Sequence, residues 1–110
     1  MKISVKTVDE IKVLEFKGKL DSQTFPGAQD QLSELIDKGE MKILVNLEKL
    51  DYISSAGLRV LLVVAKQLKT TDGELRICGL NEVVKEVFDI SGFDMILPIS
   101  VSESEALEGF

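Results

Sequence analysis

Hydrophobic and polar residues alternate at the start of the chain, and the pattern then changes twice. Ile3 to Thr7 alternates with a period of two, Asp9-Glu10 interrupts it, and apolar residues resume more densely over Ile11 to Phe16. Alternation is typical of a half-buried strand, and a denser apolar run indicates a more deeply buried one. We therefore expect a hairpin whose second strand ends at Gly18.

A helical period replaces the strand period in residues 21–40. Four apolar residues fall at helical spacing there: Ala28, Leu32, Leu35 and Ile36. Ser22 or Thr24 is a candidate N-cap for this helix. Pro26 suits its first turn and Gly39 suits its end, so the segment predicts one capped amphipathic helix.

The middle of the chain holds its most apolar segments. Residues 42–47 form a short continuous apolar run, which is typical of a central strand covered on both faces. A turn with Ser54 and Ser55 follows, and then a helix with a very wide apolar stripe, so we expect this helix to be deeply buried. The stripe consists of Leu58, Leu61, Leu62, Ala65 and Leu68.

The last third alternates strand and helix again. Residues 75–78 predict a strand, Asn81 caps a helix that ends near Gly92, and Met95 to Ile99 predicts a last short strand, kept to an edge by Pro98. Ser102 to Glu105 has the sequence of a capping box and predicts a C-terminal helix. Val101 and Ala106 are spaced for a weak hydrophobic staple across its start. The alternation predicts one α/β domain with a mixed, largely parallel sheet and about four helices packed on it.

Composition narrows the function classes. With 110 residues and 45% hydrophobic content, the chain suffices for a single core. A net charge of −6 argues against a nucleic-acid partner, because a phosphate backbone would repel the chain. The N-terminus lacks the apolar core of a secretory signal, and the longest apolar run, Val60 to Ala65, is too short to cross a bilayer. We therefore expect a soluble cytoplasmic protein that does not enter a membrane.

No enzyme or metal motif stands out. The chain has no histidine, so the usual general base and the commonest metal ligand are missing. The serine turn matches neither a nucleophile elbow nor a phosphate-binding loop, and no lysine is placed to activate a serine. The single Cys78 lies in an apolar run and is interpreted as a buried hydrophobe. We expect no enzymatic activity and no cofactor.

Two loops that follow predicted strands carry the remaining candidate residues. In open α/β sheets, ligand sites form beyond the carboxyl ends of the strands. Gly18 to Ser22 and Asp51 to Gly57 both occupy such positions, so Asp21 and the two serines are expected at one end of the molecule. By itself, Asp21 is better explained as a helix cap or a turn former than as a functional residue.

The serine turn also favours a negative charge. The start of a helix has free N–H groups and the positive end of the helix dipole. A phosphate on Ser54 or Ser55 would add about −1.5 to −2 charges there without disrupting the helix. Gly57, in the first turn, permits either the close approach of another protein or tight packing of the helix on the sheet.

The segment "NLEKLDYISSAGLRVLL", with "GKLD" before it and "FDISGFDMILPI" after it, closely resembles the STAS domain of bacterial anti-sigma factor antagonists. The resemblance covers nearly the whole chain and implies that residues 1–110 are a single STAS domain. It puts Ser55 at the family's phosphoacceptor position and Ser54, the less favoured acceptor, at the position of the motif aspartate. Asp21 matches the aspartate of the family's G-x-L-D segment, which lies near the phosphoacceptor.

The resemblance implies a partner switch. Unphosphorylated, the protein would bind a kinase-type anti-sigma factor and release the sigma factor. A serine kinase of that type would use its own ATP to phosphorylate Ser55, and a PP2C-like phosphatase would reverse the modification. The arginine at position 59, where the family commonly has glycine, would either pair with a phosphate or sit in solvent. The expected partner-binding residues are Asp21, Ser22, Ser54, Ser55, Ala56, Gly57 and Arg59.

Two questions stay open at this point. Because Ser54 replaces the motif aspartate, the chain also fits a STAS interaction module that binds a partner or a small ligand without any phosphorylation cycle. Neither the identity of the sigma factor nor the oligomeric state follows from the sequence.

Overall fold

The computed structural model describes residues 1–92 and 97–110. Its strands are β1 (Lys2–Val8), β2 (Ile11–Leu20), β3 (Lys42–Asn46), β4 (Leu50–Ile53), β5 (Glu74–Cys78) and β6 (Ile99–Ser100). Its helices are α1 (Phe25–Asp37), α2 (Ser55–Thr70), α3 (Glu82–Ser91) and α4 (Glu103–Glu108).

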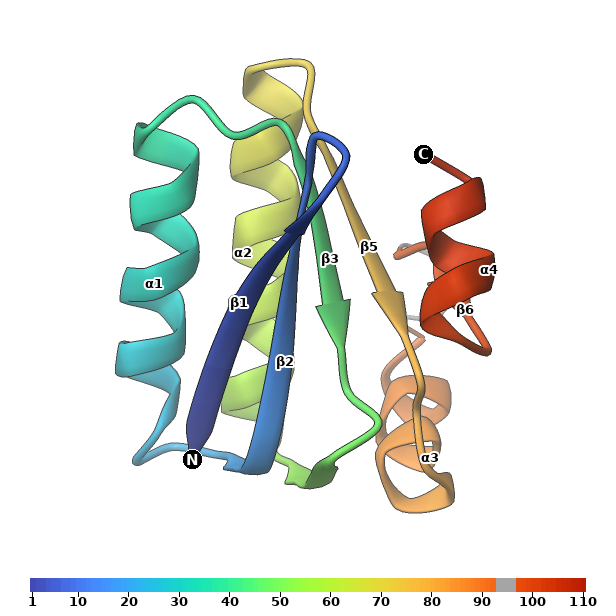
Figure 1. Cartoon of the computed structure of the whole chain (residues 1–110). Coiled ribbons are helices and arrows are strands. Elements are labelled where there is room, and N and C mark those ends of the chain that lie inside the picture. The colour runs from blue at the N-terminus through green and yellow to red at the C-terminus, as the bar shows by residue number, and fades with distance from the viewer. Residues whose placement is uncertain (93–96) are drawn as a thin grey trace.

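The described strands form a mixed sheet in the order β1-β2-β3-β5-β6 (Figure 1). β1 runs antiparallel to β2, whereas the β2–β3, β3–β5 and β5–β6 pairs are parallel. β4 pairs in parallel with the last residues of β2. The predicted α/β class, with a largely parallel sheet and four helices, is confirmed over the described residues.

Helices cover the two faces of the sheet unequally. α1 and α2 pack on one face of the sheet, drawn to the left of the strands and behind them in Figure 1, and the large core lies between these layers. The short α4 covers part of the other face through a smaller cluster around Ala106 and Cys78. β3 contributes Ile43 and Val45 to the first cluster and Leu44 to the second, so the prediction of a strand buried on both faces is confirmed.

Polar contacts also attach α4 to its face of the sheet. Glu103 accepts hydrogen bonds from the Lys6 Nζ at 2.8 Å and from the Asn46 amide nitrogen at 3.2 Å. The Lys6 ammonium, followed in effect by the Asn46 amide, holds the pKa of Glu103 below its usual range. Asn46 is 2% exposed, and its side-chain oxygen also accepts from the backbone N–H of Glu48, so its buried amide is satisfied.

The second strand is longer than its pattern indicates. The expectation that it ends at Gly18 is wrong, because β2 continues to Leu20. Gly18 has φ +107°, which an L side chain rarely adopts, and the register between β2 and β4 shifts there. The strand therefore bends at Gly18 instead of ending, and its extension pairs with β4, a strand that the hydrophobic pattern did not predict.

Both edges of the sheet differ in detail from the predicted elements. β1 is more exposed than expected, since Val5 is 49% exposed. Of the predicted last strand, Met95 and Ile96 lie outside the described residues, Leu97 and Pro98 precede the strand, and only Ile99–Ser100 is a strand. The predicted staple is wrong: Val101 is 82% exposed and does not pack across the start of α4.

Three predicted helix boundaries are confirmed. The Asn81 side chain accepts from the backbone N–H of Val84 at 2.8 Å, and the Ser102 hydroxyl oxygen accepts from that of Glu105 at 3.2 Å. Both side chains therefore satisfy free amides at a helix start. Gly92 ends α3 in the left-handed conformation typical of a helix C-terminus.

Candidate functional site

Ser54 is the N-cap of α2. Its backbone is extended, and its hydroxyl oxygen accepts from the backbone N–H of Gly57 at 3.2 Å. Its carbonyl accepts the first bond of the helix, from the N–H of Leu58 at 2.9 Å. The side chain is half-buried, so one of the two serines is committed to starting the helix.

Ser55 is the first residue of α2 and is exposed. Within the described part of the chain, its hydroxyl makes no hydrogen bond, and the first turn of α2 contains no acidic residue. Arg59 is also exposed and follows four residues later, so it lies on the same side of the helix as Ser55. An anion attached to Ser55 would therefore meet the positive helix end and a cation on one surface.

The strand register brings Asp21 to the serine turn. Leu20 pairs with Ile53 in the parallel β2–β4 ladder, and the N–H of Ser54 donates to the carbonyl of Leu20 at 2.9 Å. The residues that leave the two strands, Asp21 and Ser54, therefore start from adjacent positions. In Figure 1 this is the lower end of the sheet, where β2 finishes and both α1 and α2 begin.

Asp21 itself organises the start of α1. Its Oδ1 accepts from the backbone N–H groups of Gln23 at 2.9 Å and of Thr24 at 3.1 Å. These bonds, the one from Gln23 first, hold the pKa of Asp21 below its usual range. The interpretation of Asp21 as a turn former is thus correct, and it leaves a half-buried, charged side chain beside the serines.

The predicted cap of α1 is wrong in detail. Ser22 is exposed and lies outside the helix. Thr24 occupies the N-cap position, but its backbone is already helical (φ −99°, ψ −16°) and its hydroxyl makes no capping bond. The hydroxyl instead accepts from the N–H of Asp21 at 2.9 Å and donates to the carbonyl of Lys19 at 2.8 Å.

Gly57 serves the packing of α2 on β2. A Cβ at this position would lie 2.6 Å from the carbonyl oxygen of Leu20 and 2.7 Å from its Cγ. Real Cβ atoms do not approach backbone oxygens this closely, so the helix start needs glycine to reach the end of β2. Of the two roles considered for Gly57, the geometry supports tight packing.

Two residues at this end of the sheet had no functional role in the sequence interpretation. Tyr52 lies on β4 beside Lys19 and is 43% exposed, so it adds an aromatic surface close to the serines. Thr24 was considered only as a helix cap. Threonine hydroxyls often bond to backbone groups a few residues away. The closeness of Thr24 to Asp21 and Lys19 in the sequence was therefore the available signal for its hydrogen bonds.

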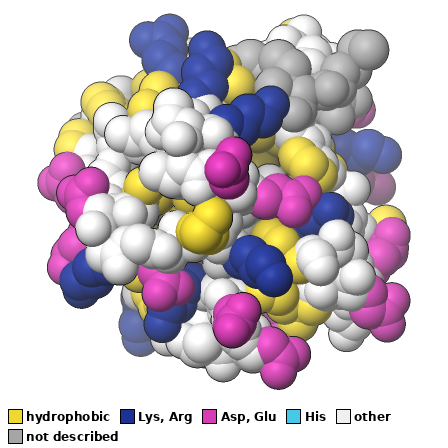
Figure 2. All heavy atoms as spheres, turned by 90° about the horizontal axis from the view of Figure 1, so that it is seen from above, with side chains coloured by type: hydrophobic (Ala, Val, Ile, Leu, Met, Phe, Trp, Pro, Cys, Tyr) yellow, Lys and Arg dark blue, Asp and Glu magenta, His cyan; other side chains and the backbone are white. Residues whose placement is uncertain are grey.

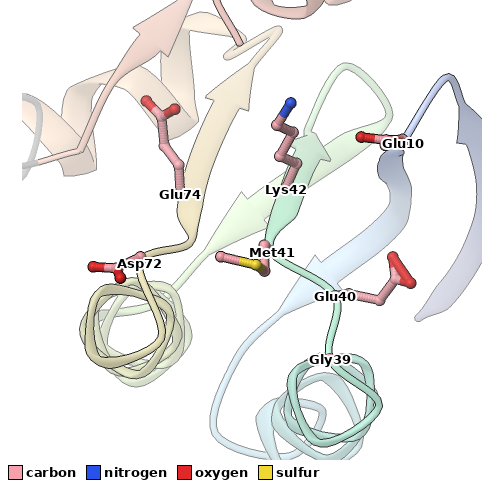
Figure 3. Close-up of a pocket in the computed structure, with 7 residues that line it drawn as sticks. All are labelled: Glu10, Gly39, Glu40, Met41, Lys42, Asp72 and Glu74. Carbon is pink, nitrogen blue, oxygen red and sulfur yellow. The ribbon is translucent and has the colours of Figure 1, made fainter.

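The opposite end of the sheet holds a different kind of surface. A depression of about 370 Å³ lies between the β1–β2 turn and the loops that precede β3 and β5. Figure 2 shows this end with acidic and basic side chains interspersed. In Figure 3, Asp72 and Glu40 point in opposite directions, and no described group of three acidic, cysteine or histidine residues is placed to hold a metal ion.

Several other polar groups have surroundings that a structural role explains. Cys78 is fully buried, and burial, before any nearby charge, raises the pKa of its thiol to about 12. Lys49 forms an ion pair with Glu15 at 3.1 Å. The carboxylates of α3 are exposed, as expected of a solvated helix face. No helix among residues 1–92 and 97–110 combines the length and apolar character that a membrane span requires.

Comparison with known proteins adds relatives over the whole length. A family model described as the STAS domain matches residues 2–106. BtrV of Bordetella bronchiseptica, a proposed anti-sigma factor antagonist, is 42% identical over 110 residues, covering all of this chain and 95% of BtrV. The anti-sigma-B factor antagonist of Staphylococcus aureus is 30% identical over 102 residues, covering 91% of this chain and 94% of that protein. The crystal structure of a proposed anti-sigma factor antagonist from Thermotoga maritima has a TM-score of 0.92 at 26% identity, covering 97% of this chain and 92% of that one.

Proposed function

Because the chain belongs to the STAS domain family, we propose that it is an anti-sigma factor antagonist whose binding is switched by phosphorylation of Ser55. The domain is a regulator and not an enzyme, in keeping with its family. The match over residues 2–106 supports treating residues 1–110 as one STAS domain. The switch operates in the cytoplasm, where sigma factors act.

In the proposed cycle, the unphosphorylated protein binds an anti-sigma factor that is also a serine kinase, and the sigma factor held by that kinase is released. The kinase then transfers the γ-phosphoryl group of its ATP to the Ser55 hydroxyl, which loses its proton. The phosphorylated protein no longer binds, and a PP2C-like phosphatase removes the phosphate with water. Every catalytic group belongs to these two partners.

The observation that carries the proposal is the different engagement of the two serine hydroxyls. Ser54 is half-buried and its oxygen accepts from the N–H of Gly57, whereas Ser55 is exposed and its hydroxyl is free within the described chain. A phosphoryl acceptor has to enter the active site of the kinase, and this requires an exposed, unengaged oxygen. Ser55 meets that requirement without loss of the helix cap.

The surroundings of Ser55 explain how a phosphate acts as a switch and leaves the fold intact. The amides at the start of α2 and the nearby Arg59 stabilise the dianion on the free protein. Asp21 already supplies one negative charge beside the turn, so the phosphate makes the surface strongly anionic. The docking surface of the kinase accommodates Asp21 and a neutral serine. A phosphate on Ser55 would be repelled by carboxylates on that surface, or would be buried there without a positive partner.

Mapping of the modified peptide tests the acceptor. After incubation with the kinase and ATP, we expect a single phosphate on Ser55 and none on the Ser55→Ala variant. Ser54→Ala should still be phosphorylated, although loss of the cap costs about 1 kcal/mol of folding stability. Phosphate on Ser54 alone would contradict the assignment.

The same assay separates the proposed function from a constitutive STAS module. A module without a phosphorylation cycle would remain unmodified and would bind its partner equally before and after phosphatase treatment. We expect instead that phosphatase treatment of protein purified from its own cells increases the amount of anti-sigma factor it captures.

A further inference from the structure

The hydroxyl of Thr24 connects the end of β2 to the start of α1. It accepts from the backbone N–H of Asp21 at 2.9 Å and donates to the carbonyl of Lys19 at 2.8 Å. The backbone N–H of Thr24 in turn donates to Oδ1 of Asp21 at 3.1 Å. The Thr24 hydroxyl also lies 3.3 Å from the same Oδ1, so its proton is shared between that oxygen and the carbonyl of Lys19. We call these four hydrogen bonds the Thr24 clasp. Through these bonds, Thr24 holds both the backbone N–H and the side-chain carboxylate of Asp21.

The clasp leaves one oxygen of Asp21 available. Oδ1 accepts from the N–H groups of both Gln23 and Thr24, so its lone pairs are used within the chain. Within the described residues, Oδ2 has no hydrogen-bond or ion-pair partner. The carboxylate is therefore fixed by one oxygen and can offer the other to a donor on a second protein.

The position of Asp21 makes this arrangement relevant to Ser55. Its predecessor Leu20 pairs with Ile53, and the carbonyl of Leu20 accepts from the N–H of Ser54. A partner that reaches the Ser55 hydroxyl therefore also meets the segment that the clasp holds. An aspartate that is already fixed loses less side-chain entropy on docking than a free one.

We propose that Thr24 is the positioning residue for Asp21: the clasp holds Oδ1 at the start of α1 so that Oδ2 receives a hydrogen-bond donor of the docked kinase. This inference rests on the proposed function, since it concerns how the same kinase recognises the surface beside Ser55. Thr24 does not itself contact the phosphoryl group. It acts through the carboxylate.

The first test uses the isolated protein. The substitution Thr24→Val keeps the shape of the side chain and removes the hydroxyl, whereas Thr24→Ser keeps the hydroxyl and serves as the matched control. The titration of the Asp21 carboxyl, followed by NMR, should move upward toward the ordinary range in Thr24→Val and stay low in Thr24→Ser. Urea unfolding of each variant shows whether the folded state is retained. An unchanged Asp21 pKa in folded Thr24→Val would overturn the inference.

The second test measures phosphorylation by the same kinase that is used in the mapping experiment. We expect Thr24→Val to lower kcat/KM for Ser55 by about tenfold, through a raised KM, which is the loss of roughly one charge-assisted hydrogen bond. Thr24→Ser should restore the wild-type value. Asp21→Asn should cost at least as much, and Thr24→Val should add no more than about twofold to it, because the clasp then has no carboxylate to position.

The outcomes separate this inference from the function on which it depends. The positioning role alone would be overturned if the wild type is phosphorylated but Thr24→Val lowers kcat/KM by the same factor in the wild type and in the Asp21→Asn variant. A loss in kcat with an unchanged KM would overturn it as well, since docking would then be intact. A wild-type protein that the kinase does not phosphorylate would overturn the proposed function and this inference together.

Discussion

At the end of the sheet where β2 and β4 finish, the side chains of Ser54, Asp21 and Thr24 are all bonded to nearby backbone groups. At the opposite end, the carboxylates of Glu10, Glu40, Asp72 and Glu74 line a depression of about 370 Å³, and in Figure 3 Asp72 and Glu40 point away from each other. The charged groups that line this depression therefore do not converge on one point. Under the proposed function, fixed geometry and not the number of charges makes the serine end of the sheet the recognition surface.

The largest expected effect tests the two ends directly. Ser55→Asp places a carboxylate on the proposed interface, and we expect the affinity for the anti-sigma factor to fall about 100-fold, since like-charge contacts in an interface cost several kcal/mol. Folding stability should change by less than about 1 kcal/mol, because an acidic residue suits the start of a helix. Isothermal titration calorimetry measures the first and thermal unfolding the second.

Two controls accompany this substitution. Ser104→Asp adds the same charge to another exposed serine in the first turn of a helix, and Glu10→Gln changes a charge at the opposite end of the sheet. Both variants should bind within about twofold of the wild type. A loss of affinity as large as that of Ser55→Asp in either control would mean that net charge, and not position, governs binding.

The next effect concerns the contact that brings the two loops of the site together. In Gly57→Ala, the new Cβ would lie 2.6 Å from the carbonyl oxygen of Leu20, a backbone atom with little room to move. We expect a loss of about 1–3 kcal/mol in the free energy of unfolding, as for other overpacked sites. Gly27→Ala is the matched control, since a Cβ there meets nothing within 4 Å. It should be neutral or stabilising by up to about 1 kcal/mol, as measured by urea unfolding.

This pair of variants also probes the site itself. Because Leu20 immediately precedes Asp21, any shift that relieves the contact moves Asp21 relative to Ser55. Phosphorylation of Gly57→Ala should therefore be slower than that of the wild type at a temperature where both are folded. Equal rates would show that the spacing of the two loops is not important for recognition.

The sequence predicted well those elements that local patterns determine. α1, α2 and α3 have strong helical periods, and the placement of Asp21 and the serine turn at one end of the sheet was expected from the rule that parallel strands end at one edge. The strand that leads into the serine turn is β4, however, and not the strand predicted at residues 42–47. β4 was missed because its four residues show neither the alternation of a half-buried strand nor a continuous apolar run. Leu50 and Ile53 are buried, and the two residues between them are exposed. Its identity as a strand depends on pairing with β2 beyond the bend at Gly18, which is a non-local contact.

The details of the site were less predictable for a similar reason. Which serine caps α2 depends on whether the helix begins at Ser55 or one residue later, and sequence patterns do not locate a helix end to one residue. The Thr24 clasp requires a helical backbone at Thr24 together with the carbonyl of Lys19 pointing back at it. Neither condition has a signature in the hydrophobic pattern, so the hydrogen bonds of this hydroxyl, and the positioning role proposed for it, depend on the three-dimensional structure.

The smallest expected effect is the response of stability to acid. The pKa of Asp21 is held below its usual range by the N–H groups of Gln23 and Thr24, and that of Glu103 chiefly by Lys6. A carboxyl whose pKa is lowered in the folded state binds protons more readily in the unfolded chain. The stability it contributes is complete above the unfolded pKa near 4 and is lost as the pH falls through the folded value.

Urea unfolding from pH 7 to pH 2 should therefore show a decline in the free energy of unfolding that begins near pH 4. Asp21→Asn and Glu103→Gln should each flatten the decline, and the double variant should flatten it by the sum of the two, since the sites lie on separate elements. A decline as steep in the double variant as in the wild type would show that neither carboxylate is held by its neighbours in solution.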